Sequence, residues 1–261
     1  MTLLVGTRFP WEDLRQWPGF RGLFAPWMAD GIILAADSRW TFPSGRTEDG
    51  AVKLFGIGTN AIATYAGSVA AGEDAIIGLS TQLKGGEATL AEWTSNVTAV
   101  IDAAWRQHQP NEDGLEVLLA YSYPSGGAWL GHFSSADGFS AHEVTDMITI
   151  GPERARLHFS QALRAATAQN MRSLETAANL LMIETAASLI VAALTDACEL
   201  RADEAVGGKV LCAATMLGQP QGIGVTRLMP TPKGIRVDTL GLDAQRGQTL
   251  RRGFEYSPPP E

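Results

Sequence analysis

Residues 31–39 read Gly-Ile-Ile-Leu-Ala-Ala-Asp-Ser-Arg, an apolar run that ends at Asp37. A short apolar run that follows a turn signal is typical of a buried β-strand. Residues 51–57 read Ala-Val-Lys-Leu-Phe-Gly-Ile and predict a further strand that contains Lys53. An acid and a base in segments that otherwise predict buried sheet are costly unless they are paired. We therefore expect Asp37 to hold Lys53.

The overall composition limits the class of protein. The chain has 261 residues, of which 45% are hydrophobic, and a formal charge of −8. This length allows one large domain or two small ones, and the sequence shows neither a linker nor an internal repeat. We therefore expect a single domain over residues 1–256. The negative charge argues against nucleic acid or an anionic membrane as a partner, because both require clustered Lys and Arg.

The titratable residues outside this pair predict no metal or cofactor. The four histidines are scattered, and no Cys and His cluster has metal-ligand spacing. Cys198 and Cys212 have apolar neighbours, which favours buried thiols in a reduced, cytoplasmic protein. The longest apolar stretch, residues 177–194, is interrupted by Asn179 and Glu184 and predicts a buried helix instead of a membrane span. No targeting segment is visible at the start of the sequence.

Hydrophobic periodicity predicts alternating groups of strands and helices. The predicted strands are 2–9, 31–37, 51–58, 61–67, 116–123, 128–133, 147–150, 210–216 and 222–228, and the predicted helices are 72–83, 89–108, 152–166 and 173–198. Several strands are apolar on both faces, which favours two sheets packed face to face with helices outside them. The predicted fold class is α+β, a four-layer αββα sandwich with two antiparallel sheets flanked by helix pairs.

Residues 10–29 interrupt this pattern between the first two strands. The segment concentrates five aromatic residues: Trp11, Trp17, Phe20, Phe24 and Trp27. Two interpretations remain open, a surface that meets another subunit or partner and a satellite cluster folded onto its own domain. Either way, the insertion joins the two strands at the end remote from Thr2. Residues 257–261, Ser-Pro-Pro-Pro-Glu, predict a disordered tail.

The spacing of three motifs resembles one known family. Asp37 and Lys53 are sixteen residues apart, and Gly67, in Ala66-Gly67, follows Lys53 by fourteen. Together with the segment 30–39, this spacing resembles the proteasome β-subunit and HslV-like family of N-terminal nucleophile hydrolases, as a bacterial proteasome-like homologue. The order of helices and strands follows the family over nearly the whole chain. Residues 30–67 carry the specific part of the resemblance.

The resemblance implies a threonine-type endopeptidase whose nucleophile is Thr2, exposed by removal of Met1. A threonine hydroxyl needs a nearby base, and a free α-amino group has an ordinary pKa near neutral pH. Lys53 would favour ionisation of the hydroxyl and Asp37 would hold Lys53 charged. The backbone N–H of Gly67 would receive the developing oxyanion.

The resemblance also implies a substrate pocket, in which we place Tyr65, Trp40 and Phe55. Tyr65 would line the primary specificity pocket and fill it, which favours small substrate side chains. The alternative interpretation of Tyr65 is a residue of the sheet core.

Two positions depart from the family's pattern. Pro152 stands where the family has a serine after the glycine that begins the third helix. The motif Asp-x-x-Ser-Gly reads Asp203-Glu204-Ala205-Val206-Gly207 here, so Asp203 is kept, with the catalytic role that the resemblance implies, and the serine is replaced by Val206. Both serines belong to the hydrogen-bond network of the terminal amine. One neutral hydrogen bond changes a rate by about tenfold, so a slow or narrowly selective enzyme is expected.

The resemblance further implies self-assembly into a homo-oligomeric ring or double ring that acts on peptides or unfolded proteins. An ATPase unfoldase partner is compatible with the sequence but not identified by it. Two alternatives remain beside the peptidase. The first is a catalytically impaired structural member of such an assembly that binds a partner. The second is an N-terminal nucleophile amidase that acts on a small amide.

Overall fold

The computed structural model describes most of the chain. The described residues are 2–9, 31–41, 44–57, 61–82, 89–108, 114–122, 128–174, 183–200, 203–215, 224–231, 234–243 and 248–256. The aromatic insertion at 10–29 and the tail at 257–261 lie outside these ranges, so both predictions about them stay predictions.

Two antiparallel sheets form the centre of the molecule. The first has the order β10-β1-β2-β11, with β1 at Leu4–Phe9, β2 at Gly31–Asp37, β10 at Met147–Ile150 and β11 at Val210–Thr215. The second has the order β5-β6-β7-β8-β9, with β5 at Phe55–Ile57, β6 at Ala61–Gly67, β7 at Leu115–Ser122, β8 at Ala128–Ser134 and β9 at His142–Glu143. All their neighbouring strands run antiparallel.

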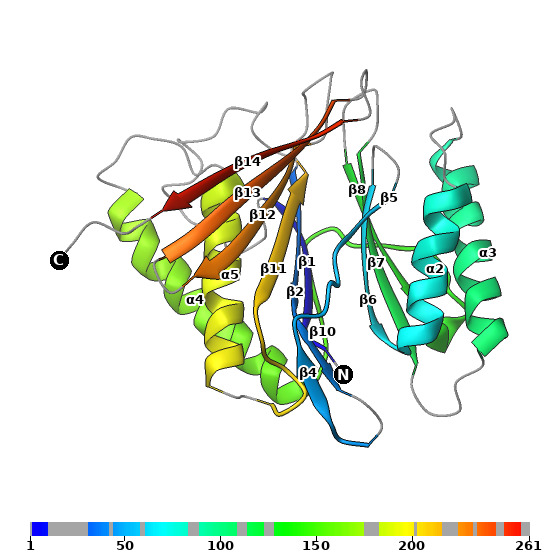
Figure 1. Cartoon of the computed structure of the whole chain (residues 1–261), viewed down its shortest axis with the longest axis horizontal. Helices are drawn as coiled ribbons and strands as arrows, with labels where there is room; N and C mark the ends of the chain where they lie inside the picture. Colours follow the sequence, from blue (N-terminus) through cyan, green and yellow to red (C-terminus); the bar gives the residue numbers. More distant parts are fainter. Residues whose placement is uncertain are drawn as a thin grey trace.

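Helix pairs cover the outer faces of the two sheets (Figure 1). Helices α4 (Glu153–Leu174) and α5 (Ile183–Glu199) lie on the first sheet, and α2 (Val69–Gln82) and α3 (Leu90–His108) lie on the second. Three apolar clusters separate the four layers, one under each helix pair and one between the sheets. The predicted α+β fold with four αββα layers is confirmed.

The register of β1 and β2 places Asp37 at the start of the chain. Leu4 pairs with Ala36 and Phe9 pairs with Gly31, and the Asp37 N–H donates to the Leu3 carbonyl at 3.2 Å. The connection between the two strands therefore leaves at the Phe9 end, opposite to Thr2, as the sequence predicts.

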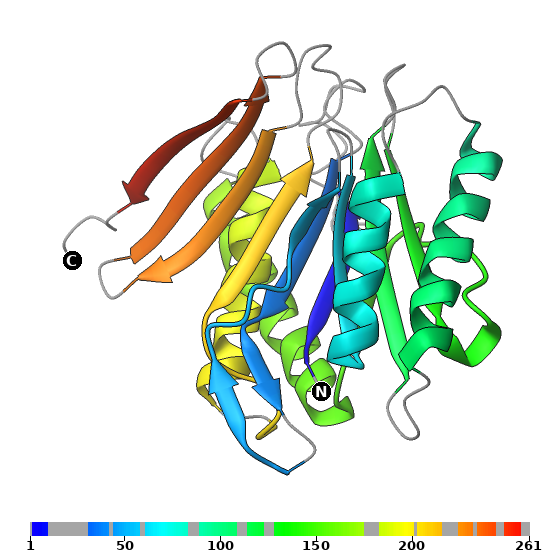
Figure 2. The same ribbon diagram turned by 45° about the vertical axis from the view of Figure 1, so that its right-hand side comes forward.

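Two further pairings lie outside the central sheets. A short hairpin joins β3 (Arg39–Thr41) to β4 (Thr47–Asp49). Strands β12 (Gly224–Thr231), β13 (Gly234–Asp243) and β14 (Gln248–Tyr256) form a three-stranded antiparallel sheet. Figure 2 shows this sheet next to β11, on the side away from β1. The prediction ended at residue 228 and missed β13 and β14, although Ile235, Val237 and Thr239 alternate with polar residues as a strand requires.

The backbone around Lys53 differs from the predicted strand. The prediction put residues 51–58 in one strand, but β5 covers only Phe55–Ile57. Gly50 takes a positive φ of 105°, and the N–H groups of Gly50 and Ala51 both donate to the Ser38 carbonyl at 2.9 Å. These bonds turn the chain, so Lys53 approaches from an irregular segment and not from a strand.

The helix boundaries follow local capping. Helix α3 matches its prediction because Thr89 and Glu92 form a capping box, with their side chains bonding each other's backbone N–H at 2.9 and 3.3 Å. Helix α2 begins three residues before its predicted start, where the Ser68 carbonyl accepts from Gly72 N–H at 3.0 Å.

The other helix pair is divided differently from the prediction. Helix α4 extends to Leu174 instead of ending at 166, and α5 begins at Ile183 instead of 173. The residues that extend α4, from Thr167 to Leu174, are mostly good helix formers such as Ala, Gln, Met and Arg.

Both cysteines are buried and free, as expected. Burial raises the pKa of each thiol to about 12, and the nearby Asp37 charge adds to this effect at Cys198. Among the described residues, no helix combines the length and the apolar character that crossing a membrane requires.

The cluster between the sheets is the packing on which the sandwich depends, so we expect Leu118→Ala to destabilise the fold. Leu118 is fully buried there and lies against Gly6, where an added Cβ would stand 3.0 Å from its side chain. The free energy of unfolding in urea should fall by about 2–5 kcal/mol. Ile77→Ala, at a 60% exposed position of α2, should stay within about 0.5 kcal/mol. Equal effects of the two substitutions would contradict this packing.

Candidate active site

The Asp37 carboxylate is the centre of a buried polar cluster. Its Oδ1 accepts hydrogen bonds from the Thr2 hydroxyl, from the Leu3 N–H at 2.9 Å and from the Lys53 ammonium at 3.0 Å. Its Oδ2 accepts from the Arg39 N–H at 3.2 Å and the Gly207 N–H at 3.1 Å. Asp37 is fully buried, and this set of donors compensates the lost hydration of its charge.

Lys53 reaches the same point from the irregular segment before β5. Its ammonium donates to Asp37 Oδ1, to the Thr2 hydroxyl and to the Arg39 carbonyl, and the residue is only 3% exposed. Burial lowers the pKa of Lys53, and the Asp37 carboxylate opposes that shift. The predicted pairing of Asp37 with Lys53 is thus present in the structure.

Thr2 completes the cluster at the entrance to β1. Its hydroxyl lies between the Lys53 ammonium and the Asp37 carboxylate, and the residue is 5% exposed. Gly151 packs so closely beneath it that an added Cβ would lie 2.4 Å from the Thr2 carbonyl oxygen. The structure therefore brings Thr2, Asp37 and Lys53 together from three separate segments.

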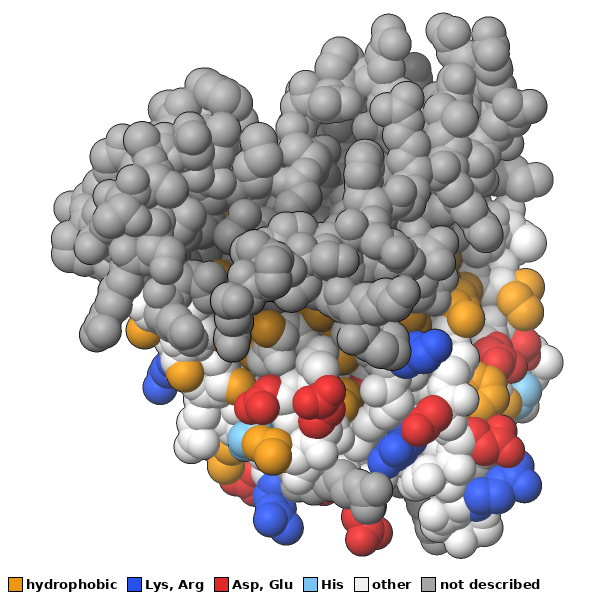
Figure 3. Space-filling model, turned by 60° about the vertical axis from the view of Figure 1, so that its left-hand side comes forward, with side chains coloured by type: hydrophobic (Ala, Val, Ile, Leu, Met, Phe, Trp, Pro, Cys, Tyr) orange, Lys and Arg blue, Asp and Glu red, His pale blue; other side chains and the backbone are white. Residues whose placement is uncertain are grey.

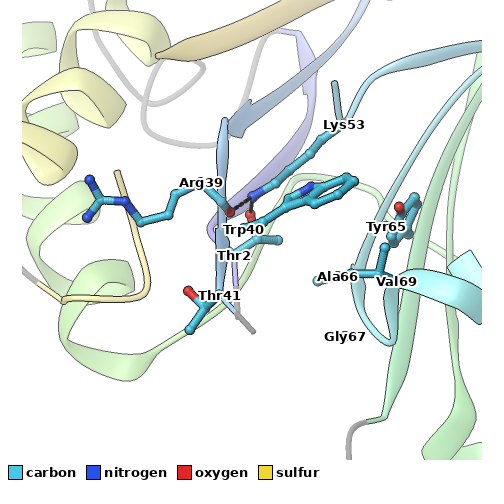
Figure 4. Close-up of a pocket in the computed structure, with 9 residues that line it drawn as sticks. All are labelled: Thr2, Arg39, Trp40, Thr41, Lys53, Tyr65, Ala66, Gly67 and Val69. Atoms are coloured by element: carbon cyan, nitrogen blue, oxygen red, sulfur yellow. Dashed lines mark hydrogen bonds between the residues drawn. The ribbon is translucent and has the colours of Figure 1, made fainter. Parts of the chain in front are cut away.

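A cleft opens beside Thr2 (Figure 4). It contains about 340 Å³ of space, part of it open to solvent. The residues that line it are Thr2, Arg39, Trp40, Thr41, Lys53, Tyr65, Ala66, Gly67 and Val69. The Arg39 side chain points away from this space, whereas the Trp40 indole projects from β3 toward Tyr65.

Gly67 ends β6 at the wall of this cleft. Its φ is 100°, a conformation that favours glycine. A Cβ at this position would also lie 1.8 Å from the Gly114 carbonyl oxygen. Only glycine fits here, so the exposed backbone of residue 67 can approach a ligand beside Thr2.

Two of the three predicted pocket residues line the cleft, and the third supports them. Trp40 and Tyr65 line it. Phe55 stacks behind Tyr65 with ring centroids 5.9 Å apart, so it holds the ring instead of facing the cleft. Helix α2 contributes Gly72, where an added Cβ would lie 2.2 Å from the Tyr65 ring. The Tyr65 ring is therefore fixed on both sides, and burial raises the pKa of its phenol.

The loop that carries Asp203 touches the site through a different residue. The Asp203 carboxylate accepts from the Ala205 N–H at 2.9 Å and so organises its own loop. Gly207 of the same loop donates to Asp37. Val206, at the position of the expected serine, is fully buried in the cluster beneath α4 and α5. Asp203 is thus connected to Asp37 through its loop.

Arg39 is a site residue that the sequence reasoning missed. Its guanidinium makes a two-pronged contact with Asp49 at 2.7 and 3.1 Å, and it donates to the carbonyls of Glu204 and Val206. Asp49 raises the pKa of Arg39. Arg39 therefore ties the β3–β4 hairpin to the loop beside Asp37. The polar ending Asp37-Ser38-Arg39 of an apolar strand was the only sequence signal for this role.

Pro152, the other departure from the expected pattern, precedes α4. Its carbonyl accepts the first helical hydrogen bond, from the Arg156 N–H at 3.0 Å. A proline here has no side-chain donor or acceptor to offer Thr2, which lies against the adjacent Gly151.

Comparisons with known proteins agree with the geometry at the level of the fold. No protein-family model matches the sequence, and no curated protein matches it. The four αββα layers are the fold that the resemblance of residues 30–67 implies. Among solved structures, the chain is similar to Anbu (ancestral beta-subunit) from Yersinia bercovieri. The TM-score is 0.55, the identity is 14%, and the match covers 83% of this chain and 82% of that one.

The chemistry available at the site is that of an acid, a base and a hydroxyl. No group of three or more His, Cys, Asp and Glu among the described residues is arranged to hold a metal ion.

On the face drawn in Figure 3, acidic and basic side chains of the described residues are interspersed.

Asp37 and Lys53 should be energetically coupled. Asp37→Asn leaves a buried ammonium without its counter-charge, and Lys53→Met leaves the carboxylate without its ammonium, so each should cost about 3–5 kcal/mol of unfolding free energy. The double variant should lose less than the sum of the two by about 1–3 kcal/mol. Urea denaturation of all four proteins measures this coupling. As a control, Glu48→Gln at the exposed Arg46 pair should cause no measurable change. Additive losses would rule out the buried pair.

Proposed function

We propose that this chain is a threonine-type peptidase in which Thr2, exposed by removal of Met1, attacks the carbonyl carbon of a peptide bond. The observation that carries the proposal is the position of the Thr2 hydroxyl. It contacts both the Lys53 ammonium and the Asp37 carboxylate, beside a cleft that Gly67 lines.

In the first step, the free α-amino group of Thr2 takes the hydroxyl proton while the oxygen bonds to the substrate carbonyl carbon. The Lys53 ammonium stabilises the negative charge that develops on the Thr2 oxygen. The Asp37 carboxylate opposes the lowering of the Lys53 pKa by burial and so favours the charged ammonium. The substrate carbonyl oxygen becomes an oxyanion and is met by the backbone N–H of Gly67.

In the second step, the C–N bond breaks and the leaving amine receives the proton held by the α-amino group. The acyl group is then an ester on Thr2, and a water molecule, deprotonated by the same amine, hydrolyses it. As the ester breaks, the Thr2 oxygen takes the proton that the amine removed from water, so the hydroxyl and the free amine are both restored and the cycle needs no cofactor.

The cleft sets the preferred substrate. The fixed Tyr65 ring and the Trp40 indole occupy the space beside Thr2, so residues with small side chains fit best before the scissile bond. We extend the proposal to a self-compartmentalising homo-oligomer related to HslV-like rings, which would admit unfolded chains and act in the cytoplasm.

Val206 and Pro152 favour a second candidate function, a structural subunit without turnover. Neither side chain can form a hydrogen bond to the terminal amine, and Val206 is fully buried. Retention of Met1 would support this candidate, because a blocked threonine has no free amine.

The nucleophile can be tested by substitution. Intact mass should show loss of Met1. Thr2→Ala, which retains a small second residue, should lower peptide hydrolysis by about a thousandfold or more, whereas Thr2→Ser should keep measurable activity. A peptide epoxyketone should add to the wild-type protein and not to Thr2→Ala, as read by mass. Full activity of Thr2→Ala on fluorogenic peptides would refute the proposal.

Restoring a hydroxyl at position 206 should separate a slow enzyme from an inactive subunit. Val206→Ser would place a hydrogen-bonding group in the loop that donates to Asp37, and kcat should rise up to about tenfold. Its cost should be about 1–3 kcal/mol of unfolding free energy, because Val206 is buried in an apolar cluster. Val206→Ala provides the control without a hydroxyl. Equal kcat values for the Ser and Ala variants would contradict a catalytic role for a hydroxyl here.

A further inference from the structure

A second polar cluster stands on the inner face of the second sheet. Glu116 on β7 accepts from the Ser134 hydroxyl at 2.9 Å through Oε1 and contacts His132 Nε2 through Oε2. The side chains of Glu116 and His132 are 32% and 21% exposed. Their strand neighbours Leu118 and Leu130 are fully buried between the sheets. Glu116 and His132 are therefore polar and partly exposed on a sheet face where their neighbours are apolar and buried, which suggests a role other than packing.

This Glu116 cluster lies one strand away from the wall of the cleft. In the β6–β7 register, Ala66 pairs with Glu116, so the two side chains leave the same face of the sheet at neighbouring positions. Ala66 itself lines the cleft beside Thr2. The next strand adds Ser134, which pairs with Glu116. The cluster therefore continues the cleft wall from β6 to β7 and β8.

We call the space beside Tyr65, which would hold the acyl part of the substrate, the acyl pocket. The Glu116 cluster lies on the opposite side of β6 from this pocket. Lys53 leads into β5, and Phe55 on β5 supports Tyr65. The sheet order β5-β6-β7-β8 puts Glu116 beyond β6, away from those residues. A peptide with its acyl part beside Tyr65 and its scissile carbonyl at Thr2 and Gly67 must place its amine part in the other direction, toward β7.

The hydrogen bonds of the cluster arrange the Glu116 carboxylate to bind a ligand, and they do not arrange Ser134 to react with one. Ser134 donates to the carboxylate instead of to the histidine, and its oxygen also accepts from the Ala136 N–H at 3.2 Å, so it is not arranged as a nucleophile. The Glu116 carboxylate can accept about four hydrogen bonds, and Ser134 and His132 supply two. Both partners hold it in one orientation while it is a third exposed, so its charge remains available to a ligand.

We propose that Glu116, held by His132 and Ser134, forms a subsite for a cationic side chain, lysine or arginine, on the leaving-amine part of the substrate. This inference rests on the proposed peptidase function. The charged groups around it are already engaged: His142, opposite His132 in the register, contacts Asp137, and Glu143 pairs with Arg8. The Glu116 carboxylate is therefore the group of this cluster that meets an incoming cation.

The test uses three quenched peptides with the same acyl sequence and alanine before the scissile bond. They differ only in the next residue, which is lysine, glutamine or glutamate. For the wild-type protein, kcat/KM should be about fivefold higher for lysine than for glutamine, and lower again for glutamate. Glu116→Gln keeps partners for Ser134 and His132 but removes the charge, so the ratio should fall to about one. Glu116→Lys should reverse the order.

Asp74→Asn is the matched control, because Asp74 forms a histidine–carboxylate pair with His108 on the outer helices. Its lysine-to-glutamine ratio should equal that of the wild-type protein. If Glu116→Lys fails to fold, Glu116→Gln decides alone, with its unfolding curve as the check on its fold.

Binding separates this inference from the proposed function. The Thr2→Ala protein and its Glu116→Gln derivative are titrated with fluorescent forms of the three peptides, and anisotropy gives each Kd. A lysine preference that disappears with Glu116→Gln supports the subsite, even if no peptide is hydrolysed. Equal binding of the three peptides, or a preference that survives Glu116→Gln, overturns it, even if hydrolysis confirms the peptidase.

Discussion

The arrangement around Thr2 depends on one buried carboxylate. Asp37 accepts five hydrogen bonds, and four of them come from three other parts of the chain: residues 2–3, the segment before β5 and the loop after α5. The fifth comes from Arg39, two residues further along its own chain. Because an uncompensated buried charge costs several kcal/mol, these segments are held together at the position of Asp37. The site is therefore part of the framework of the fold.

The same constraint explains the local backbone. Lys53 can reach Asp37 and Thr2 because Gly50, with its positive φ, turns the chain after the β3–β4 hairpin. Arg39 binds Asp49 on the other strand of that hairpin and the loop carrying Val206. The position of the ammonium beside Thr2 thus depends on the hairpin, whose Arg39 carbonyl accepts from Lys53, and on the loop that the Arg39 guanidinium binds. Both are elements where substitution would alter the site from a distance.

The apolar runs predicted the four layers and the pairing of Asp37 with Lys53, because they are local signals, whereas the place of Thr2 beside that pair was implied by the resemblance of residues 30–67 to a known family. The prediction wrongly placed Lys53 in a strand. The chain turns there because Gly50 and Ala51 bond to Ser38, and hydrophobic periodicity gives no sign of bonds between residues that far apart. The prediction also placed Phe55 in the pocket, whereas ring stacking puts it behind Tyr65. Glu116, His132 and Ser134 were missed because only the strand register brings them together.

The loop that carries Val206 contributes both to the packing of the core and to the site. The Val206 side chain fills the apolar cluster beneath α4 and α5, while the next residue donates to Asp37. The resemblance implies that a serine at this position would bond the terminal amine, and without that bond its hydroxyl would be a polar group in apolar surroundings. The valine instead stabilises the loop that orients Asp37. Under the proposed function, the chain has the group that positions the ammonium and lacks a hydroxyl that would assist proton transfer, which is expected to make the site stable and slow.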